Sequence, residues 1–315
     1  MTQHIFGLGE ILWDLLPSGP RFGGAPANFA STCAGLAGPT TRVHMLGAVG
    51  TDELGTAAIG ALADRFVDTS LVQQLRQPTG TVDVLIDASG LASYQFADDA
   101  AWDHLQWQPG LLEAAAGCAA VCYGTLGQRS EPSRDVIRRF LSATPASCIR
   151  ILDVNLRSPF YDESLIAESL QFANVLKLSD EELPHVVAAA ELGDDADRDD
   201  EIGEPEQLRM LVEKFELRCV ALTRGPRGAI LCAGDQIDTR SSPACRVVDT
   251  IGAGDAFAAA LVLGLLANAS MDAINRTAVS VAAYACTQPG GTMSFPSIDF
   301  ESDLESDFES DPLNG

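Results

Sequence analysis

The chain has 315 residues, of which 46% are hydrophobic, and it carries a formal net charge of −24 from 44 acidic and 20 basic side chains. This composition supports a sizeable core and excludes global disorder, and it lacks the basic excess with which proteins bind nucleic acids or anionic membranes. No apolar run approaches the roughly 20 residues that span a bilayer, and the first residues lack the basic start of a signal peptide, so we expect a cytoplasmic protein.

Short apolar runs typical of strands alternate with helical patterns along most of the chain. We expect strands at residues 4–9, 42–46, 119–124, 149–154, 173–178, 218–223 and 228–233, and helices at 52–66, 132–142, 180–190 and 205–216. Strands that alternate with helices at this spacing indicate βαβ units. The sequence therefore predicts an α/β fold with a mainly parallel central sheet that helices cover on both faces.

Two segments depart from this alternation and predict a second, smaller sheet. Residues 79–96 alternate apolar and polar side chains around a DASG turn, which is typical of a β-hairpin. Residues 10–23 read as a strand followed by the Pro/Gly-rich stretch PSGPRFGG. Half-buried strands of this kind commonly form a flap over a site.

Two acidic segments lie outside the pattern of core elements. Residues 191–206 predict a charged surface loop, and residues 299–315 contain the repeats FESD, LESD and FESD. We expect this tail to be solvated and disordered, with a short amphipathic turn as the alternative.

The cysteines and histidines indicate no metal site. Eight cysteines lie mostly inside apolar segments, without the paired spacing of a zinc site or a redox motif. We expect them to be reduced and buried as small hydrophobic residues. The four histidines are scattered along the chain.

Residues 252–255 read GAGD and precede a long apolar helical run. The first amides of a helix lack internal partners and carry the positive end of the helix dipole, and the small residues Gly252, Ala253 and Gly254 would let an anion approach them closely. Asp255 is then placed to accept a proton from a hydroxyl group, which is the arrangement of phosphoryl transfer to an alcohol. The alternative is a tight turn whose aspartate only caps the helix.

The chain contains no GxxxxGK[ST] loop, GxSxG elbow or HExxH motif, and GLGEIL lacks the third glycine of a dinucleotide fingerprint.

Several motifs together resemble those of one family. DTIGAGDAF (249–257) and GGAPANFA (23–30), followed by GAVGTDELG (47–55), resemble the signatures of the ribokinase-like, PfkB-type carbohydrate kinases. GEILWDLLP (9–17) and PTGTVDV (78–84) are most similar to the fructokinase branch, and DVNLR (153–157), LKLSDEEL (176–183) and LTRGPRG (222–228) follow in the family's order. The resemblance covers residues 4 to 298. It implies a ribokinase-like three-layer sandwich, with a kinase domain over residues 1–298 and a small β-sheet lid built from about 10–24 and 79–107.

The resemblance also implies roles around the reacting groups. Asp255 matches the catalytic base, and the amides of Gly252, Ala253 and Gly254 match the anion hole for the transferring phosphoryl group. It assigns Asp14, Gly24 and Asn28 to the hydroxyl groups of the sugar. We further expect Tyr94 and Phe96 to face the sugar, since apolar sugar faces pack on aromatic rings, and Asn155 and Arg157 to support phosphate and bound-water positions beside the substrate. For the two aromatic residues the alternative is a role within the lid sheet, and the arginine is a candidate cationic clamp.

Other positions match the nucleotide site of the family. Thr223, Gly225 and Gly228 match the loop that contacts ATP. Lys177 lies just before the place of the family's Asn-x-x-Glu motif, and it either contacts the phosphates of the nucleotide or lies at the surface.

The resemblance further implies metal ions. Glu182 matches the indirect ligand of the Mg²⁺ ion that ATP requires, although Ser179 stands where the family has asparagine. Many relatives bind a monovalent cation such as K⁺ at the positions of Asp249 and Ile251. The alternative is that Asp249 is a structural carboxylate that pins the loop.

We therefore expect an ATP-dependent sugar kinase that phosphorylates a primary hydroxyl group, with fructose as the acceptor and fructose 6-phosphate as the product. Alternatives are a kinase for 2-keto-3-deoxygluconate, ribose or a nucleoside, and a catalytically silent regulator that binds sugar or nucleotide. A keto-acid requires a cation near the sugar, and residues 79–107 contain no Lys or Arg, which leaves Arg21 as the candidate. The expected partners are the sugar and ATP, together with a second copy of the chain, since relatives often dimerise through the lid.

Overall fold

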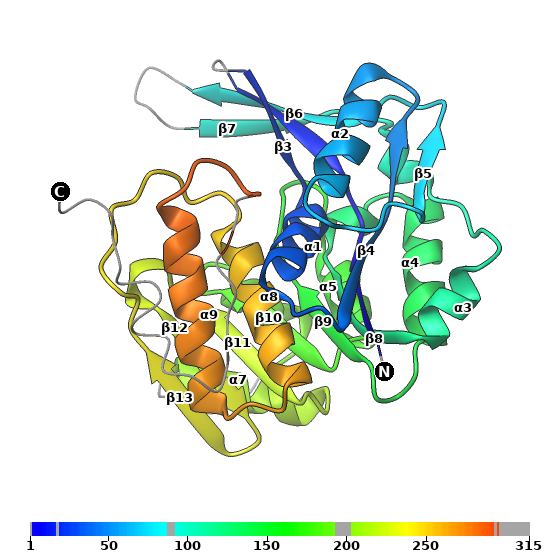
Figure 1. Cartoon of the computed structure of the whole chain (residues 1–315). Coiled ribbons are helices and arrows are strands. Elements are labelled where there is room, and N and C mark those ends of the chain that lie inside the picture. The colour runs from blue at the N-terminus through cyan, green and yellow to red at the C-terminus, as the bar shows by residue number, and fades with distance from the viewer. Residues whose placement is uncertain (1, 17–18, 87–91, 193–202, 293–294, 296–315) are drawn as a thin grey trace.

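A central sheet of nine strands runs through the part of the chain that the computed structural model describes, residues 2–16, 19–86, 92–192, 203–292 and 295 (Figure 1). The strands from β11 to β5 pair in parallel, and β12 pairs antiparallel with both of its neighbours. The mainly parallel sheet that the sequence predicts is therefore confirmed. In order across the sheet the strands are β13 (Gln236–Arg240), β12 (Ala229–Ala233), β11 (Cys219–Thr223), β10 (Val175–Ser179), β9 (Ile149–Asp153), β8 (Cys118–Tyr123), β1 (Gln3–Leu8), β4 (Thr41–Gly50) and β5 (Val72–Leu75).

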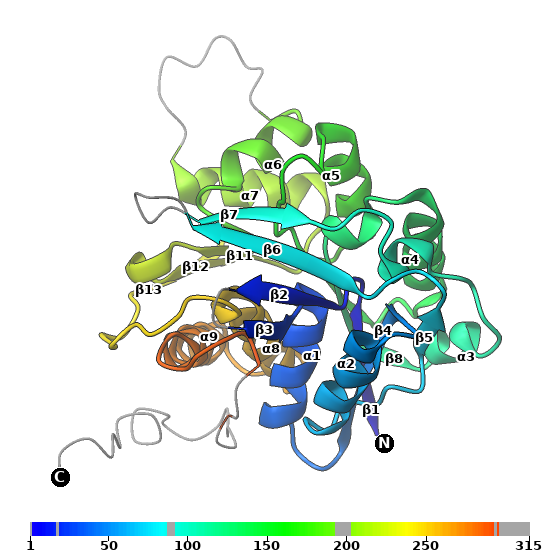
Figure 2. The same ribbon diagram turned by 90° about the horizontal axis from the view of Figure 1, so that it is seen from above.

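Helices cover both faces of this sheet, because successive side chains of its strands point into two separate apolar cores. Ile5 lies in one core and its neighbour Phe6 in the other. Figure 2 shows the two groups of helices on opposite sides of the strands, which makes the fold a three-layer α/β sandwich. The first core contains α1 (Ala25–Leu36), α2 (Glu53–Ala63), α8 (Ala253–Leu266) and α9 (Met271–Cys286), and the second contains α3 (Leu111–Ala116), α4 (Glu131–Ala143), α5 (Glu163–Leu170), α6 (Leu183–Ala189) and α7 (Glu204–Lys214).

A separate sheet of four strands lies beyond the ends of the central strands, at the top of Figure 1. Its order is β3 (Gly19–Gly23), β2 (Leu12–Leu16), β6 (Gly80–Ile86) and β7 (Ala92–Phe96). Part of the stretch read as a Pro/Gly-rich connection is therefore a strand, β3. Proline is tolerated there because β3 is an edge strand and Pro20 needs no ladder partner on its outer side.

Some expected features differ from the structure or lie outside the described residues. The helix expected at 180–190 begins at Leu183, because Glu182 is its N-cap and Pro184 occupies the first turn. The DASG turn, residues 193–202 of the acidic loop and the tail from residue 296 lie outside the described residues. Among the residues described, none of the helices combines the length and apolarity needed to cross a membrane.

A buried arginine ties the small sheet to the body of the molecule. The guanidinium group of Arg129 lies 4.0 Å from the centroid of the Trp102 ring and 4.7 Å from that of Phe160. Its Nε and Nη2 donate to Oδ1 and Oδ2 of Asp103 over 2.8 and 2.6 Å, and Nη2 also donates to the carbonyl of Ala97 over 2.7 Å. Ala97 follows β7 directly, so this side chain fixes the end of the small sheet.

We predict that Arg129→Met lowers the free energy of unfolding by about 3–5 kcal/mol, because it leaves the buried carboxylate of Asp103 without its cation. The double variant Arg129→Met/Asp103→Asn should lose less, since no unpaired charge stays buried. Urea denaturation of the two variants and the wild type measures both values. A double variant less stable than the single one would contradict the assignment of the loss to the unpaired charge.

Candidate active site

The residues at the two signature motifs meet in the interior. Nδ2 of Asn28, in the first turn of α1, donates to Oδ2 of Asp255, in the first turn of α8, over 2.8 Å. Both side chains are buried, with Asp255 9% exposed. Burial raises the pKa of Asp255, while the amide of Asn28 and the charges of Lys177 and Arg157 act in the opposite direction. A carboxylate with a raised pKa is suited to accept a proton near neutral pH.

The glycines of the GAGD motif serve the packing of the chain. Gly252 is the N-cap of α8 with a φ of 79°, and a Cβ atom there would lie 2.6 Å from the Cα of Gly291. At Gly254 a Cβ atom would lie 2.8 Å from the Nζ of Lys177. The amide of Ala253 donates to Thr250 over a long 3.3 Å. The space where a side chain of residue 254 would lie is thus filled by the ammonium group of Lys177. This group adds positive charge at the N-terminus of α8.

Lys177 is held in this place by a buried ion pair. Its Nζ lies 2.9 Å from Oδ1 of Asp153, and both side chains are buried. Burial lowers the pKa of Lys177, but Asp153, Glu182 and Asp255 outweigh that effect and hold it above its ordinary value. The surface position that the sequence left open for this lysine is therefore wrong.

Polar residues from the first strands and from the start of α1 form a cluster near Asp255. Asp14 is on β2, and Oδ2 of its side chain lies 3.0 Å from where a Cβ atom of Gly23 would be. Gly24 has a φ of 106°, and a Cβ atom there would lie 2.6 Å from the carbonyl of Glu10. Burial raises the pKa of Asp14. The structure thus brings three of the expected acceptor residues, Asp14, Gly24 and Asn28, to one region.

Arg157 faces the same cluster from the loop after β9. Its positive charge lowers the pKa values of Asp14 and Asp255 against the effect of burial. Nη1 of Arg157 donates to the carbonyl of Leu156 over 3.0 Å, and Asn155 has a φ of 42°, which turns the chain at this point. The side chain of Arg157 is exposed and therefore accessible to a ligand.

The two aromatic residues expected at the acceptor are placed differently. Tyr94 on β7 is 55% exposed. Phe96 packs edge-to-face on Phe160, with ring centroids 5.6 Å apart, and joins the small apolar cluster around Trp102. For Phe96 the structure favours the alternative role within the small sheet.

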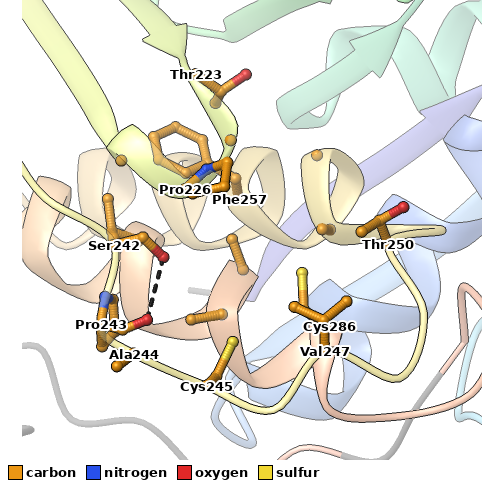
Figure 3. Close-up of a pocket in the computed structure, with 17 residues that line it drawn as sticks. Thr223, Pro226, Ser242, Pro243, Ala244, Cys245, Val247, Thr250, Phe257 and Cys286 are labelled. Atoms are coloured by element: carbon orange, nitrogen blue, oxygen red, sulfur yellow. Dashed lines mark hydrogen bonds between the residues drawn. The ribbon is translucent and has the colours of Figure 1, made fainter.

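A cavity of about 400 Å³ lies beside the GAGD loop (Figure 3). Its wall includes all three residues expected in the nucleotide loop, Thr223, Gly225 and Gly228, together with Ala253 and Gly254. Pockets of this volume hold small organic ligands.

One side of this cavity is apolar and was not expected from the sequence. Figure 3 shows Cys286 of α9 and Val247 of the segment before α8 beside the pocket, and Val279, Ala282 and Ala283 of α9 complete this side. The amides of Val248 and Asp249 donate to the carbonyl of Cys286, which fixes this segment against α9. Small apolar residues on a helix give no sequence signal that separates a ligand wall from ordinary core.

Among the described residues, no group of three or more His, Cys, Asp or Glu side chains is placed to hold a metal ion. Magnesium usually keeps several waters and takes one or two carboxylates beside substrate phosphates. Glu182 accepts the amides of Leu156 and Ser179 at its two oxygens, both over 2.8 Å. These bonds orient a carboxylate whose remaining lone pairs can reach the ion through water.

The carboxylate of Asp249, which is expected at a monovalent-ion site, is paired with Arg21 in this structure. Its Oδ2 accepts Nη1 of Arg21 over 2.8 Å and the amide of Gly290 over 3.1 Å, and its Oδ1 accepts the amide of Ile251 over 3.0 Å. A guanidinium group already compensates the charge of the carboxylate. The geometry favours the alternative in which Asp249 is structural and pins the loop.

Glu10 is the polar residue of this region that the sequence reasoning missed. It is 2% exposed, and its Oε2 is buried without a hydrogen-bond partner. Burial, with a further contribution from Asp255, raises the pKa of Glu10 to about 7. The available signal was a charged residue directly after an apolar strand, at its carboxyl end.

Comparison with known proteins gives one family. A model described as "pfkB family carbohydrate kinase" matches residues 20–298. The fructokinase of Salmonella typhimurium is 29% identical over 327 residues, which cover 98% of this chain and all of that protein.

Solved structures agree with this match. An uncharacterized sugar kinase from Pyrococcus horikoshii, solved with ATP, superposes with a TM-score of 0.76 at 25% identity and covers 93% of this chain and 95% of its own. The fructokinase of Vibrio cholerae O395, solved with fructose, ADP and calcium, has a TM-score of 0.74 at 25% identity, with 94% and 96% covered.

The raised pKa of Glu10 predicts a pH dependence of stability. A carboxyl group whose pKa rises from 4.5 to about 7 on folding favours the folded state only while it is protonated, so its contribution is lost as the pH rises through about 7. Glu10→Gln cannot ionise, and relative to the wild type it should gain about 2.5 kcal/mol of unfolding free energy between pH 5 and pH 8.

Urea denaturation at a series of pH values measures this gain. Glu113→Gln, on an exposed position of α3, is the matched control and should follow the wild-type curve. Parallel curves for Glu10→Gln and the wild type would show that Glu10 does not keep its proton in the folded state.

Proposed function

The chain belongs to the pfkB family of carbohydrate kinases, and from this membership we propose that it transfers the γ-phosphoryl group of MgATP to a primary hydroxyl group of a small sugar, with fructose as the acceptor and fructose 6-phosphate as the product. The observation that carries the proposal is the place of Asp255. Its carboxylate is bonded to Asn28, one of the expected acceptor residues, and the residues directly before it, Ala253 and Gly254, line the 400 Å³ cavity. We propose that the acceptor is bound on the side of Asn28 and the nucleotide in the cavity.

In the proposed reaction Asp255 removes the proton of the sugar hydroxyl group. The hydroxyl oxygen then forms a bond to the γ-phosphorus, and the bond between that phosphorus and the bridging oxygen breaks. The electron pair of the broken bond stays on the released ADP, so charge and atoms balance. Asn28 holds the carboxylate by its 2.8 Å hydrogen bond and keeps it aimed at the acceptor.

The loop at residues 252–254 stabilises the transferring group by charge. The N-terminus of α8 and the buried ammonium group of Lys177 beside Gly254 both supply positive potential. Mg²⁺ bound with ATP neutralises charge on the phosphates, and Glu182 is the residue we propose to hold its water shell. Thr223, Gly225 and Gly228 are proposed to contact the nucleotide in the cavity.

Three observations support fructose over an acidic acceptor. Curated relatives that cover nearly the whole chain are named fructokinase. The carboxyl group of Asp14 and the amide of Asn28 are groups that suit the hydroxyl groups of a polyol. Arg21, the candidate cation for a keto-acid, is already paired with Asp249.

We further propose that residues 1–298 form the kinase domain and that the four-stranded sheet is its lid. The sheet is joined to the body near both sites, and a lid that excludes water would prevent hydrolysis of ATP. A measurement of the oligomeric state in solution tests whether a second copy of the chain binds, as expected, to this sheet.

We predict that Asp255→Asn lowers kcat by about 10²–10⁴-fold, because asparagine cannot accept the proton of the hydroxyl group. The affinity for ATP should change little, since Ala253 and Gly254 line the cavity and Asp255 does not. A coupled assay for ADP measures turnover, and calorimetric titration measures nucleotide binding. Glu113→Gln is again the control, and normal turnover by Asp255→Asn would refute the proposed base.

The acceptor is tested with a panel of sugars in the same assay. We expect the highest kcat/KM for fructose and lower values for ribose, 2-keto-3-deoxygluconate and nucleosides. A higher value for one of these would replace fructose as the acceptor and leave the kinase assignment intact. Binding of sugar and ATP without turnover of any sugar would instead support the silent regulator.

A further inference from the structure

One arginine joins the small sheet to the segment that carries the GAGD loop. Arg21 lies on β3, and its Nη1 is 2.8 Å from Oδ2 of Asp249, which comes three residues before Gly252. The side chain of Asp249 is 16% exposed, so its charge is largely withdrawn from water. A charge in such a place needs a compensating partner.

Asp249 fixes the entry to the loop by three hydrogen bonds. Besides Arg21 it accepts the amides of Gly290 and of Ile251, and the latter residue directly precedes the N-cap of α8. Its own amide donates to the carbonyl of Cys286. A displacement of this carboxylate would therefore shift Ala253 and Gly254, which line the cavity.

Arg21 also faces a second carboxylate. It is directly opposite Asp14 in the antiparallel pair of β2 and β3, and residues opposite each other project from the same face of a sheet. Arg21 and Arg157 both lower the pKa of Asp14, while Asp249 raises it. One guanidinium group thus lies between two acidic side chains at the border of the candidate site.

We propose that Arg21 is a built-in cation that takes the place of a monovalent ion at Asp249, so that this kinase works without K⁺. The inference rests on the proposed function, and it concerns how the GAGD loop of the proposed kinase site is held in position. The guanidinium group stays charged at every physiological pH and is part of the chain, so it occupies the carboxylate without an ion from solution. Arg21 is a positioning residue, because it acts on the loop through Asp249.

The wild-type protein gives the first test, which does not depend on whether a variant folds. Turnover is measured with KCl, NaCl or choline chloride at equal ionic strength, and we expect the same kcat in all three. The thermal unfolding temperature should likewise be equal in KCl and choline chloride. A kcat or an unfolding temperature that is higher in KCl alone would overturn the proposal.

Replacement of Arg21 gives the second test. Arg21→Met should lose about tenfold to a hundredfold in kcat in choline chloride, because the loop is no longer held in place. KCl should restore part of this loss and raise the unfolding temperature of the variant, since the freed carboxylate can then bind the ion. Arg21→Lys keeps the positive charge and should remain independent of K⁺.

Two results with Arg21→Met would overturn the proposal: full activity in choline chloride, or a loss that no monovalent ion reduces in a folded variant. Failure of the proposed function is a separate outcome. If the wild type phosphorylates no sugar in any salt, the kinase reaction is refuted, while the comparison of unfolding temperatures still reports whether Arg21 excludes K⁺.

Discussion

The position of the candidate base depends on one buried hydrogen bond, from Asn28 to Asp255. The two residues are 227 positions apart, and each lies in the first turn of a helix whose N-cap is a glycine with positive φ. The helices α1 and α8 pack together in one apolar core. The direction of the carboxylate is therefore set by the packing of two helices rather than by a loop, which is the more rigid arrangement.

The charges around this bond are balanced closely. Asp153, Asp255 and Glu10 are all buried, and Lys177 is a buried cation already in a direct ion pair with the first of them. Burial raises the pKa values of all three carboxyl groups, and the charges of Lys177 and Arg157 oppose this rise at Asp255. In a chain with 44 acidic and 20 basic residues, Lys177 and Arg157 are the cations that oppose this buried negative charge, and Lys177 lies beside Gly254 at the wall of the cavity.

The mainly parallel sheet could be predicted from local pattern, because alternating strands and helices indicate βαβ units, and the GAGD motif before an apolar run placed Asp255 at a helix start. The ribokinase-like form of the sandwich and the roles expected for Asp14, Gly24 and Asn28 came instead from the resemblance to the family. The reason for Gly254 could not be predicted, since it is the side chain of Lys177, 77 positions away, that fills the space. The apolar wall of the donor cavity on α9 and the buried Glu10 also depend on tertiary contacts, which leave no periodic signal in one sequence.

Two arginines join the small sheet to the body, and their ion pairs contribute unequally to stability. Arg129 is 8% exposed, pairs with Asp103 through two bonds and lies against two aromatic rings, so water and salt screen it little. Arg21 is 38% exposed and pairs with Asp249 through one nitrogen. An exposed single contact contributes far less than a buried bidentate pair whose loss strands a charge. Arg129 is therefore the stronger of the two attachments of the small sheet, and Arg21 serves the position of Asp249 more than the stability of the fold.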